Sequence, residues 1–272
     1  MSILLAPSLV VAPSSVLPAR HPVIGWHNLV LFGNLAADSE ADTYPVTNLA
    51  NPATTNRWLS GSTAEQLVTV SGLEGEVDYV AIARHNFGSA GVTVSVEGKI
   101  SGGSWEELFP GVLPGDDSPM MLRIASDFYT DVRLRLIPQD DPPFAAVLYV
   151  GQALVMLRPM QPGFTPIGDA KSHNLVGGWS QSGEMLGSII DGSMSSNSAS
   201  FILIDVEWYR ETMRPFVLAA NLGEPFFFAW NPEDQPNDVA YCVASSGEVQ
   251  PSINQMSGRH IDITLPMTAV SL

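Results

Sequence analysis

Short alternating segments, interrupted by proline and glycine, constrain this chain more than any other feature. The 272 residues include 21 prolines and 23 glycines, and no amphipathic run exceeds about three helical turns. Residues 66–70, 77–83, 91–96 and 131–137 instead alternate apolar with polar or small side chains, as strands with a buried face do. The sequence therefore predicts an all-β protein in which any helix is short.

The length of the chain predicts two β-sandwich-type domains, because 272 residues exceed the usual size of one domain. A linker is predicted at 157–168, where LRPMQPGFTPIG holds three prolines and two glycines. The expected parts are an extended N-terminal arm at 1–26, a first sandwich at 27–156, the linker, and a β-rich oligomerisation domain at 169–272.

In the last domain the pattern predicts several strands and two irregular segments. The strands are expected at 201–208, 216–220, 226–230, 239–244 and 260–265. The serine-rich stretch 191–200 is interpreted as a loop, and the acidic stretch 231–238 as a turn.

Charge and cysteine content exclude several classes of protein. The net charge of −16, with only 12 Lys and Arg residues, excludes nucleic acid and anionic membrane as partners. Charged residues make up 15% and hydrophobic residues 45% of the chain, which excludes a disordered protein and indicates apolar surface covered by partners. Cys242 is the single cysteine, so neither an intrachain disulfide nor a cysteine-based zinc site can form.

The first 18 residues are apolar but are interrupted by Pro7, Pro13 and Pro18. They lack the basic beginning of a signal peptide, and the prolines stop any helix long enough to cross a membrane. We interpret this stretch as an extended arm that docks on a neighbouring subunit.

Residues 44–60 read YPVTNLANPATTNRWLS and precede a predicted strand pair that runs through 77–96. This pattern resembles the discoidin-like, galactose-binding-like sandwich family over about 27–156. The resemblance implies a jelly-roll β-sandwich, and it is carried by Asn48, Leu49, Asn51, Thr54, Thr55 and Trp58. Asn51 and Pro52 stand where many family members have an acidic turn, and no calcium loop is evident, so no metal and no cofactor are expected.

The second half is similar, more loosely, to the carboxy-terminal regions of phage tail-tip proteins of the distal-tail or baseplate-hub kind. The residues that carry this resemblance are 208–215, 224–242 and 262–267. It implies a virion protein, assembled in the host cytoplasm, that forms a ring between the tail tube and the receptor-binding parts. The implied partners are sister copies (a ring, hexamer or trimer), the tail tube, the hub and the fibres.

Candidate catalytic groups have structural explanations. Residues 178–183 partly match the Gly-x-Ser-x-Gly motif of a nucleophile elbow, but Ser182 occupies the position of the second glycine. We therefore expect a structural turn at this site. The five histidines lie far apart, in neither an HxH nor an HExxH pattern. Three carboxylate pairs could flank a sugar in a glycosidase: Glu106 and Glu107, Asp116 and Asp117, Asp140 and Asp141. The two aspartate pairs lie in proline-rich turn sequences. We predict no catalytic residue.

A sugar-binding face is the main alternative function. Such sites combine an aromatic platform with planar polar groups, because sugar C–H faces stack on rings while hydroxyls need donors and acceptors. The candidates are Arg57, Trp58, Arg84, His85, Asn86 and Trp105. The protein would then recognise a host surface glycan as a receptor, or serve as an accessory module of a polysaccharide-degrading enzyme. The alternative for these residues is that the two tryptophans belong to the core and that Arg84, His85 and Asn86 form the edge of a hairpin.

The run of three phenylalanines at 226–228 exceeds simple alternation. Such a strand is either buried on both faces within the chain or covered by another subunit. Interface cores favour aromatic residues and Arg, so the candidate subunit interface comprises Trp208, Tyr209, Arg214, Phe226, Phe227, Phe228 and Trp230.

Overall fold

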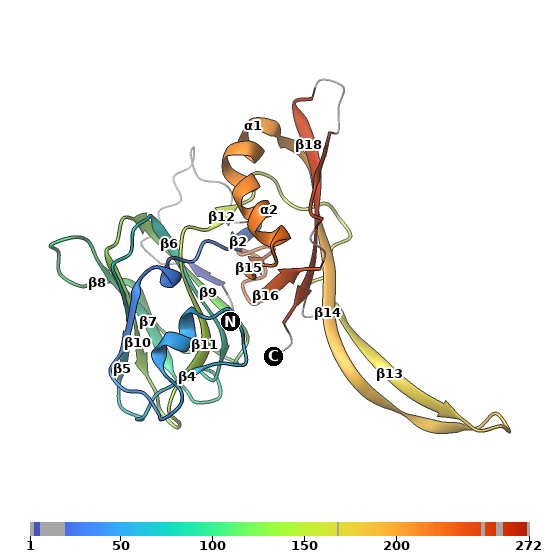
Figure 1. Ribbon diagram of the computed structural model, residues 1–272, viewed down its shortest axis with the longest axis horizontal. Helices are drawn as coiled ribbons and strands as arrows, with labels where there is room; N and C mark the ends of the chain where they lie inside the picture. Colours follow the sequence, from blue (N-terminus) through green and yellow to red (C-terminus); the bar gives the residue numbers. More distant parts are fainter. Residues whose placement is uncertain (1–2, 6–19, 168, 246–247, 254–257, 271–272) are drawn as a thin grey trace.

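The computed structural model describes residues 3–5, 20–167, 169–245, 248–253 and 258–270 and contains three β-sheets (Figure 1). The outer sheet has five strands in the order β3 (Asn34–Ala37), β5 (Gln66–Ser71), β10 (Asp131–Ile137), β7 (Thr93–Lys99) and β8 (Glu106–Val112). The middle sheet has the order β1 (Ile3–Leu5), β9 (Met120–Asp127), β6 (Val77–His85), β11 (Phe144–Gly151) and β4 (Trp58–Leu59). Two short 3₁₀ helices, η1 (Leu29–Leu31) and η2 (Val46–Ala50), lie in the connections.

The C-terminal sheet has eight strands. Seven follow the order β12 (Leu154–Val155), β2 (Val23–Gly25), β15 (Phe226–Ala229), β16 (Val239–Ala244), β18 (His260–Ala269), β14 (Met185–Asp205) and β13 (Lys171–Trp179). The eighth, β17 (Pro251–Ile253), pairs with β18.

The outer and middle sheets form the N-terminal β-sandwich. Alternation sets its core, because Val132, Leu134 and Leu136 of β10 point inward while the residues between them stay partly exposed. They pack with Trp58 and Val80 of the middle sheet in one apolar cluster. The predicted all-β class, with a sandwich in the N-terminal half, is confirmed.

The middle sheet is buried on both faces. Ile82 of β6 enters the sandwich core, whereas Tyr79 and Ala81 face the C-terminal sheet and pack with Phe227 and Tyr241. Small alanines on that face let the two sheets approach closely. The fold therefore has two sheet-on-sheet interfaces.

The far face of the C-terminal sheet is covered by one continuous helical run: α1 (Val206–Trp208), the π-turn η3 (Tyr209–Met213) and α2 (Arg214–Asn221). Asp205 begins it, since its carboxylate accepts hydrogen bonds from the backbone N–H groups of Glu207 and Trp208. Phe216 meets Phe226 edge to face with ring centroids 5.1 Å apart. In the described residues no helix is both long enough and apolar enough to cross a membrane.

Three predictions about the C-terminal half are wrong. The strand expected at 201–208 ends at Asp205, and residues 206–208 form α1 after the Asp205 cap. Residues 216–220 form part of α2 instead of a strand, because Phe216, Val217 and Ala220 lie on the one helical face that packs on the sheet. The serine-rich stretch 191–200 belongs to strand β14. There, Ser196 and Ser200 meet Thr268 and Thr264 across the ladder with oxygen–oxygen distances of 3.1 Å.

Apart from β1, the N-terminal sandwich is inserted between two neighbouring strands of the C-terminal sheet. Leu154 of β12 pairs with Ile24 of β2, so the chain leaves that sheet at Gly25 and returns beside its point of departure. Residues 23–25, which the sequence assigned to the N-terminal arm, are thus a strand of the sheet. Residues 3–5 of that expected arm do not dock on a neighbouring subunit, because they form β1 and pair with β9 of the same chain. Residues 1–2 and 6–19 lie outside the described residues.

Candidate functional site

Trp58, expected as a sugar platform, lies in the sandwich core. Its side chain is fully buried, and its indole Nε1 donates a hydrogen bond to the backbone carbonyl of Ser39 at 3.1 Å. A sugar cannot stack on a ring that solvent does not reach. The structure contradicts a platform role for this residue and supports the alternative that it belongs to the core.

His85 and Asn86 brace loops at one end of the sandwich. The Nε2 of His85 lies 2.9 Å from the backbone oxygen of Ser118, and its Nδ1 accepts from the backbone N–H of Phe87. Burial lowers the pKa of His85 to about 4, with Ser118 as an opposing influence. Asn86 donates to Pro142 and accepts from the backbone N–H of Phe144. Both side chains are buried and hydrogen-bonded within the chain, so neither presents its polar groups to a ligand.

Arg57 and Arg84 lie near these loops but not in one pocket with them. The guanidinium of Arg57 stacks on two rings, 5.0 Å from the centroid of Tyr44 and 4.7 Å from that of Phe144. Arg84 is exposed and has a positive φ of 55° at the end of β6.

Trp105 lies apart from the other five, beside the outer sheet. Its ring lies under the guanidinium of Arg133 at 4.1 Å and near the ammonium of Lys99 at 5.2 Å. Arg133 in turn makes an ion pair with Glu97. The ring is partly exposed, so of the two candidate tryptophans it is the one that can meet a ligand.

Most of the candidate interface residues pack within the chain. Phe226 and Phe228 lie under the helical run, and Phe227 lies against the middle sheet. The alternative that this strand is buried on both faces within the chain is confirmed, and Phe226 and Phe227 have no exposed ring surface for a subunit contact. Phe228 is also buried, but its ring forms part of a pocket wall. Tyr209 is buried, Trp208 and Trp230 are partly exposed, and Arg214 is exposed.

The exposed apolar surface lies instead on a protruding hairpin, residues 171–195, made by β13 and the first half of β14. Figure 1 shows the two strands leaving the body together as a curved ribbon. Eight large apolar side chains on it are between 52% and 73% exposed: Leu175, Val176, Trp179, Met185, Leu186, Ile189, Ile190 and Met194.

Both faces of this hairpin are apolar. Leu175 pairs with Ile190, and Val176 with Ile189. Directly opposed residues share a face and successive residues alternate, so the two pairs lie on opposite faces. Adjacent apolar residues in a strand are typical of burial on both sides, and this is the signal by which the sequence could have identified the hairpin.

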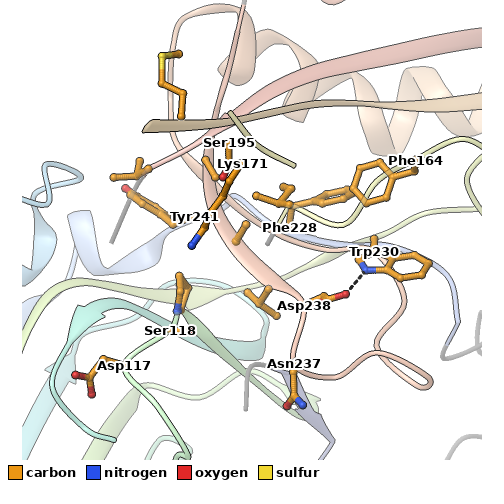
Figure 2. A pocket seen from close by; sticks show the side chains of 17 residues that line it. Asp117, Ser118, Phe164, Lys171, Ser195, Phe228, Trp230, Asn237, Asp238 and Tyr241 are labelled. Atoms are coloured by element: carbon orange, nitrogen blue, oxygen red, sulfur yellow. Dashed lines mark hydrogen bonds between the residues drawn. The ribbon is translucent and has the colours of Figure 1, made fainter. Parts of the chain in front are cut away.

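A pocket of about 450 Å³ lies at the foot of the hairpin, where the loop 117–119 of the sandwich meets the C-terminal sheet. Phe164, Phe228 and Trp230 line it, and the Trp230 indole donates to the Asp238 carboxylate at 2.8 Å. Figure 2 shows Lys171 reaching between Tyr241 and Ser118, inside the ring of lining residues. None of the residues predicted as a sugar site lines this pocket.

Two of the carboxylates and one of the serines considered for catalysis accept hydrogen bonds from backbone N–H groups. Asp116 accepts from the backbone N–H of Ser118, and Asp117 from that of Ser89. Residues 178–183 lead into the hairpin turn, where Ser180 accepts from the backbone N–H of Glu184. Within the described residues, no three His, Cys, Asp or Glu side chains gather as a metal site would require.

Comparison with known proteins gives likeness to solved structures only, since no family profile and no curated protein matches. One similar structure is chitosan-binding module 1 of a chitosanase/glucanase from Paenibacillus sp. IK-5, with 18% identity, a TM-score of 0.40, and coverage of 46% of this chain and 99% of that one. Another is CpGH89CBM32-5 from Clostridium perfringens, in complex with GalNAc-β-1,3-galactose, with 15% identity, a TM-score of 0.41, and coverage of 46% and 100%. At these values the likeness carries no argument about what this chain binds.

Proposed function

We propose that this chain is a non-catalytic structural subunit that assembles through its protruding hairpin. The observation that carries the proposal is the exposure of eight large apolar side chains on both faces of an otherwise unsupported two-stranded ribbon. An isolated hairpin is marginally stable in water, and monomeric proteins rarely leave such apolar area uncovered. Insertion between neighbouring subunits would cover both faces at once.

The finer proposal is a ring in the tip of a phage tail that connects the tail tube to receptor-binding parts. It rests on the resemblance of residues 208–215 and 224–242 to phage tail-tip proteins. The hairpin supports it, because a ring is closed by one projecting element that meets a different surface on the next copy.

Assembly is tested by replacing Ile189 and Ile190 together with threonine, which keeps the β-branched shape but removes apolar area. We expect oligomers of the unaltered chain in size-exclusion chromatography with light scattering. The double variant should assemble roughly 100-fold more weakly, since burial of one such side chain contributes about 1.5–3 kcal/mol.

Ser188→Thr is the matched control, because Ser188 lies beside Ile189 on the same exposed strand. It should assemble as the unaltered chain does. A chain that stays monomeric at every concentration, or a double variant that assembles normally, would contradict the proposal.

Carbohydrate binding is the second candidate function, either in receptor recognition or as an accessory module of a polysaccharide-degrading enzyme. The observation that favours it is Trp105, a partly exposed ring flanked by Arg133 and Lys99, which combines a stacking surface with donors for hydroxyl groups.

On a glycan array we expect Trp105→Ala to lose any signal that the unaltered chain gives. Phe128→Ala, which removes another exposed ring, should keep that signal. Equal binding by all three proteins would place the sugar site elsewhere, and an array without signal would remove this candidate.

A further inference from the structure

The pocket at the foot of the hairpin is chemically matched to the hairpin's own tip. More than half of its lining residues are aromatic or aliphatic, with Phe164, Ile167, Phe228, Trp230 and Val239 among them. Its volume of about 450 Å³ lies in the range of pockets that hold an aromatic group, roughly 300–1,000 Å³.

Two carboxylates, those of Asp117 and Asp238, and one ammonium group, that of Lys171, line the pocket. Asp238 already accepts the Trp230 N–H, and Asp117 accepts the Ser89 N–H. Lys171, by contrast, makes no ion pair with any residue that the structure describes. Its ammonium group points among the lining residues (Figure 2).

The tip of the hairpin carries the complementary groups. Trp179 pairs with Met185 across the two strands, and these side chains are 69% and 62% exposed. Glu184 precedes Met185 in the turn and supplies a carboxylate. Exposed tryptophans that enter preformed pockets are the commonest anchors of protein interfaces.

The tip cannot fill the pocket of its own chain. Lys171 is the first residue of β13 and pairs with Ser195, and both residues line the pocket. Trp179 lies eight residues further along the same extended strand, which is roughly 26 Å away. A hairpin tip that fills this pocket therefore belongs to a second molecule.

We propose that the tip of one copy's hairpin seats Trp179 and Met185 in the pocket of the next copy, with Glu184 paired to Lys171. This inference rests on the proposed function and names its partner surface. The contact joins two different surfaces, so repetition closes a ring when the rotation between copies allows it. The loop 117–119 completes one wall, so the sandwich takes part in assembly.

Crosslinking tests the geometry directly. Cys242 is fully buried, and burial raises the pKa of its thiol, so introduced cysteines are the reactive ones. In the double variant Lys171→Cys with Glu184→Cys, mild oxidation should give a ladder of covalent multimers. Glu184→Cys with Ser252→Cys, in which the second thiol lies on the exposed strand β17, should give none.

Substitutions that fill the pocket test whether it receives the hairpin tip, and they leave the sequence of the hairpin unchanged. Ser118→Trp should weaken assembly at least about 30-fold, and Trp179→Ala should do the same. Gly115→Trp is the matched control, because nothing lies within 4 Å of a side chain added there in the same loop. Unchanged thermal unfolding of each variant as a monomer shows that the fold persists.

The two proposals fail differently. If the Ile189 and Ile190 double variant dissociates while Ser118→Trp and Trp179→Ala assemble normally and no ladder forms, the hairpin has another seat and this inference is overturned. If the unaltered chain never assembles, the proposed function itself is wrong.

Discussion

His85 shows how the environment of a residue fixes its chemistry. Its ring stacks on Phe87 with centroids 4.6 Å apart, and both ring nitrogens have backbone partners. The lowered pKa, about 4, keeps the imidazole neutral at physiological pH. The sequence predicts that His85 lies at the end of a strand. It does not show whether the side chain is buried and holds a loop in place or is exposed and binds a ligand, because its burial depends on the distant loop that contains Ser118.

This pKa predicts acid sensitivity. The unfolded chain binds a proton at His85 near pH 6.5 but the folded chain only near pH 4, so the folded state loses free energy relative to the unfolded state as the pH falls between those values. The expected loss is about 3 kcal/mol in the free energy of unfolding, measured by urea titration from pH 7.5 to 4.

His85→Gln is the control, since an amide can still donate to Ser118 but does not titrate. Carboxylates other than Asp116, which interacts electrostatically with His85, titrate alike in both proteins, so the difference between the two curves reports mainly the imidazole. If the free energy of unfolding falls equally with pH in both proteins, the imidazole of His85 is not the cause of the acid sensitivity.

At the scale of elements, strand β15 joins the two halves of the protein. Phe227 packs against Tyr149 and Tyr241 with ring centroids 5.3 and 4.9 Å away, while Phe226 and Phe228 face the helical run. Phe227→Ala should lower the free energy of unfolding by about 3–5 kcal/mol, and unfolding should remain a single transition by fluorescence and circular dichroism.

Phe32→Ala is the matched control, because Phe32 is 80% exposed. It should change the free energy of unfolding by no more than about 0.5 kcal/mol. A loss below about 1 kcal/mol for Phe227→Ala would mean that the halves are not joined through this ring.

The elements that sequence predicted well are those whose burial follows local alternation. Strands β10 and β16 occupy the expected 131–137 and 239–244. The serine-rich part of β14 was missed because its ladder with β18 and its small hydroxyl side chains, rather than an apolar face, hold it extended. Residues 216–220 were predicted wrongly because a run of five apolar and small residues fits both the two-residue period of a strand and the 3.6-residue period of a helix.

For the whole molecule, sequence indicated two halves but not how they are joined. Strands β2 and β12 are three and two residues long and pair across about 130 positions of sequence, so no local pattern reveals them. The sugar-site candidates were likewise separated by the fold, with Trp105 on the outer sheet and His85 on the middle sheet.

The adjacency of β2 and β12 makes the sandwich an exchangeable head. Apart from β1, which pairs with β9 from the other side of β2 in the sequence, the sandwich begins and ends on neighbouring strands, about 5 Å apart. A different domain with similarly close termini can therefore take the place of residues 26–153 without rerouting the C-terminal sheet. A replacement must still cover Phe227 and Tyr241. The C-terminal body can thus carry unrelated domains at this position while the hairpin at 171–195 stays unchanged.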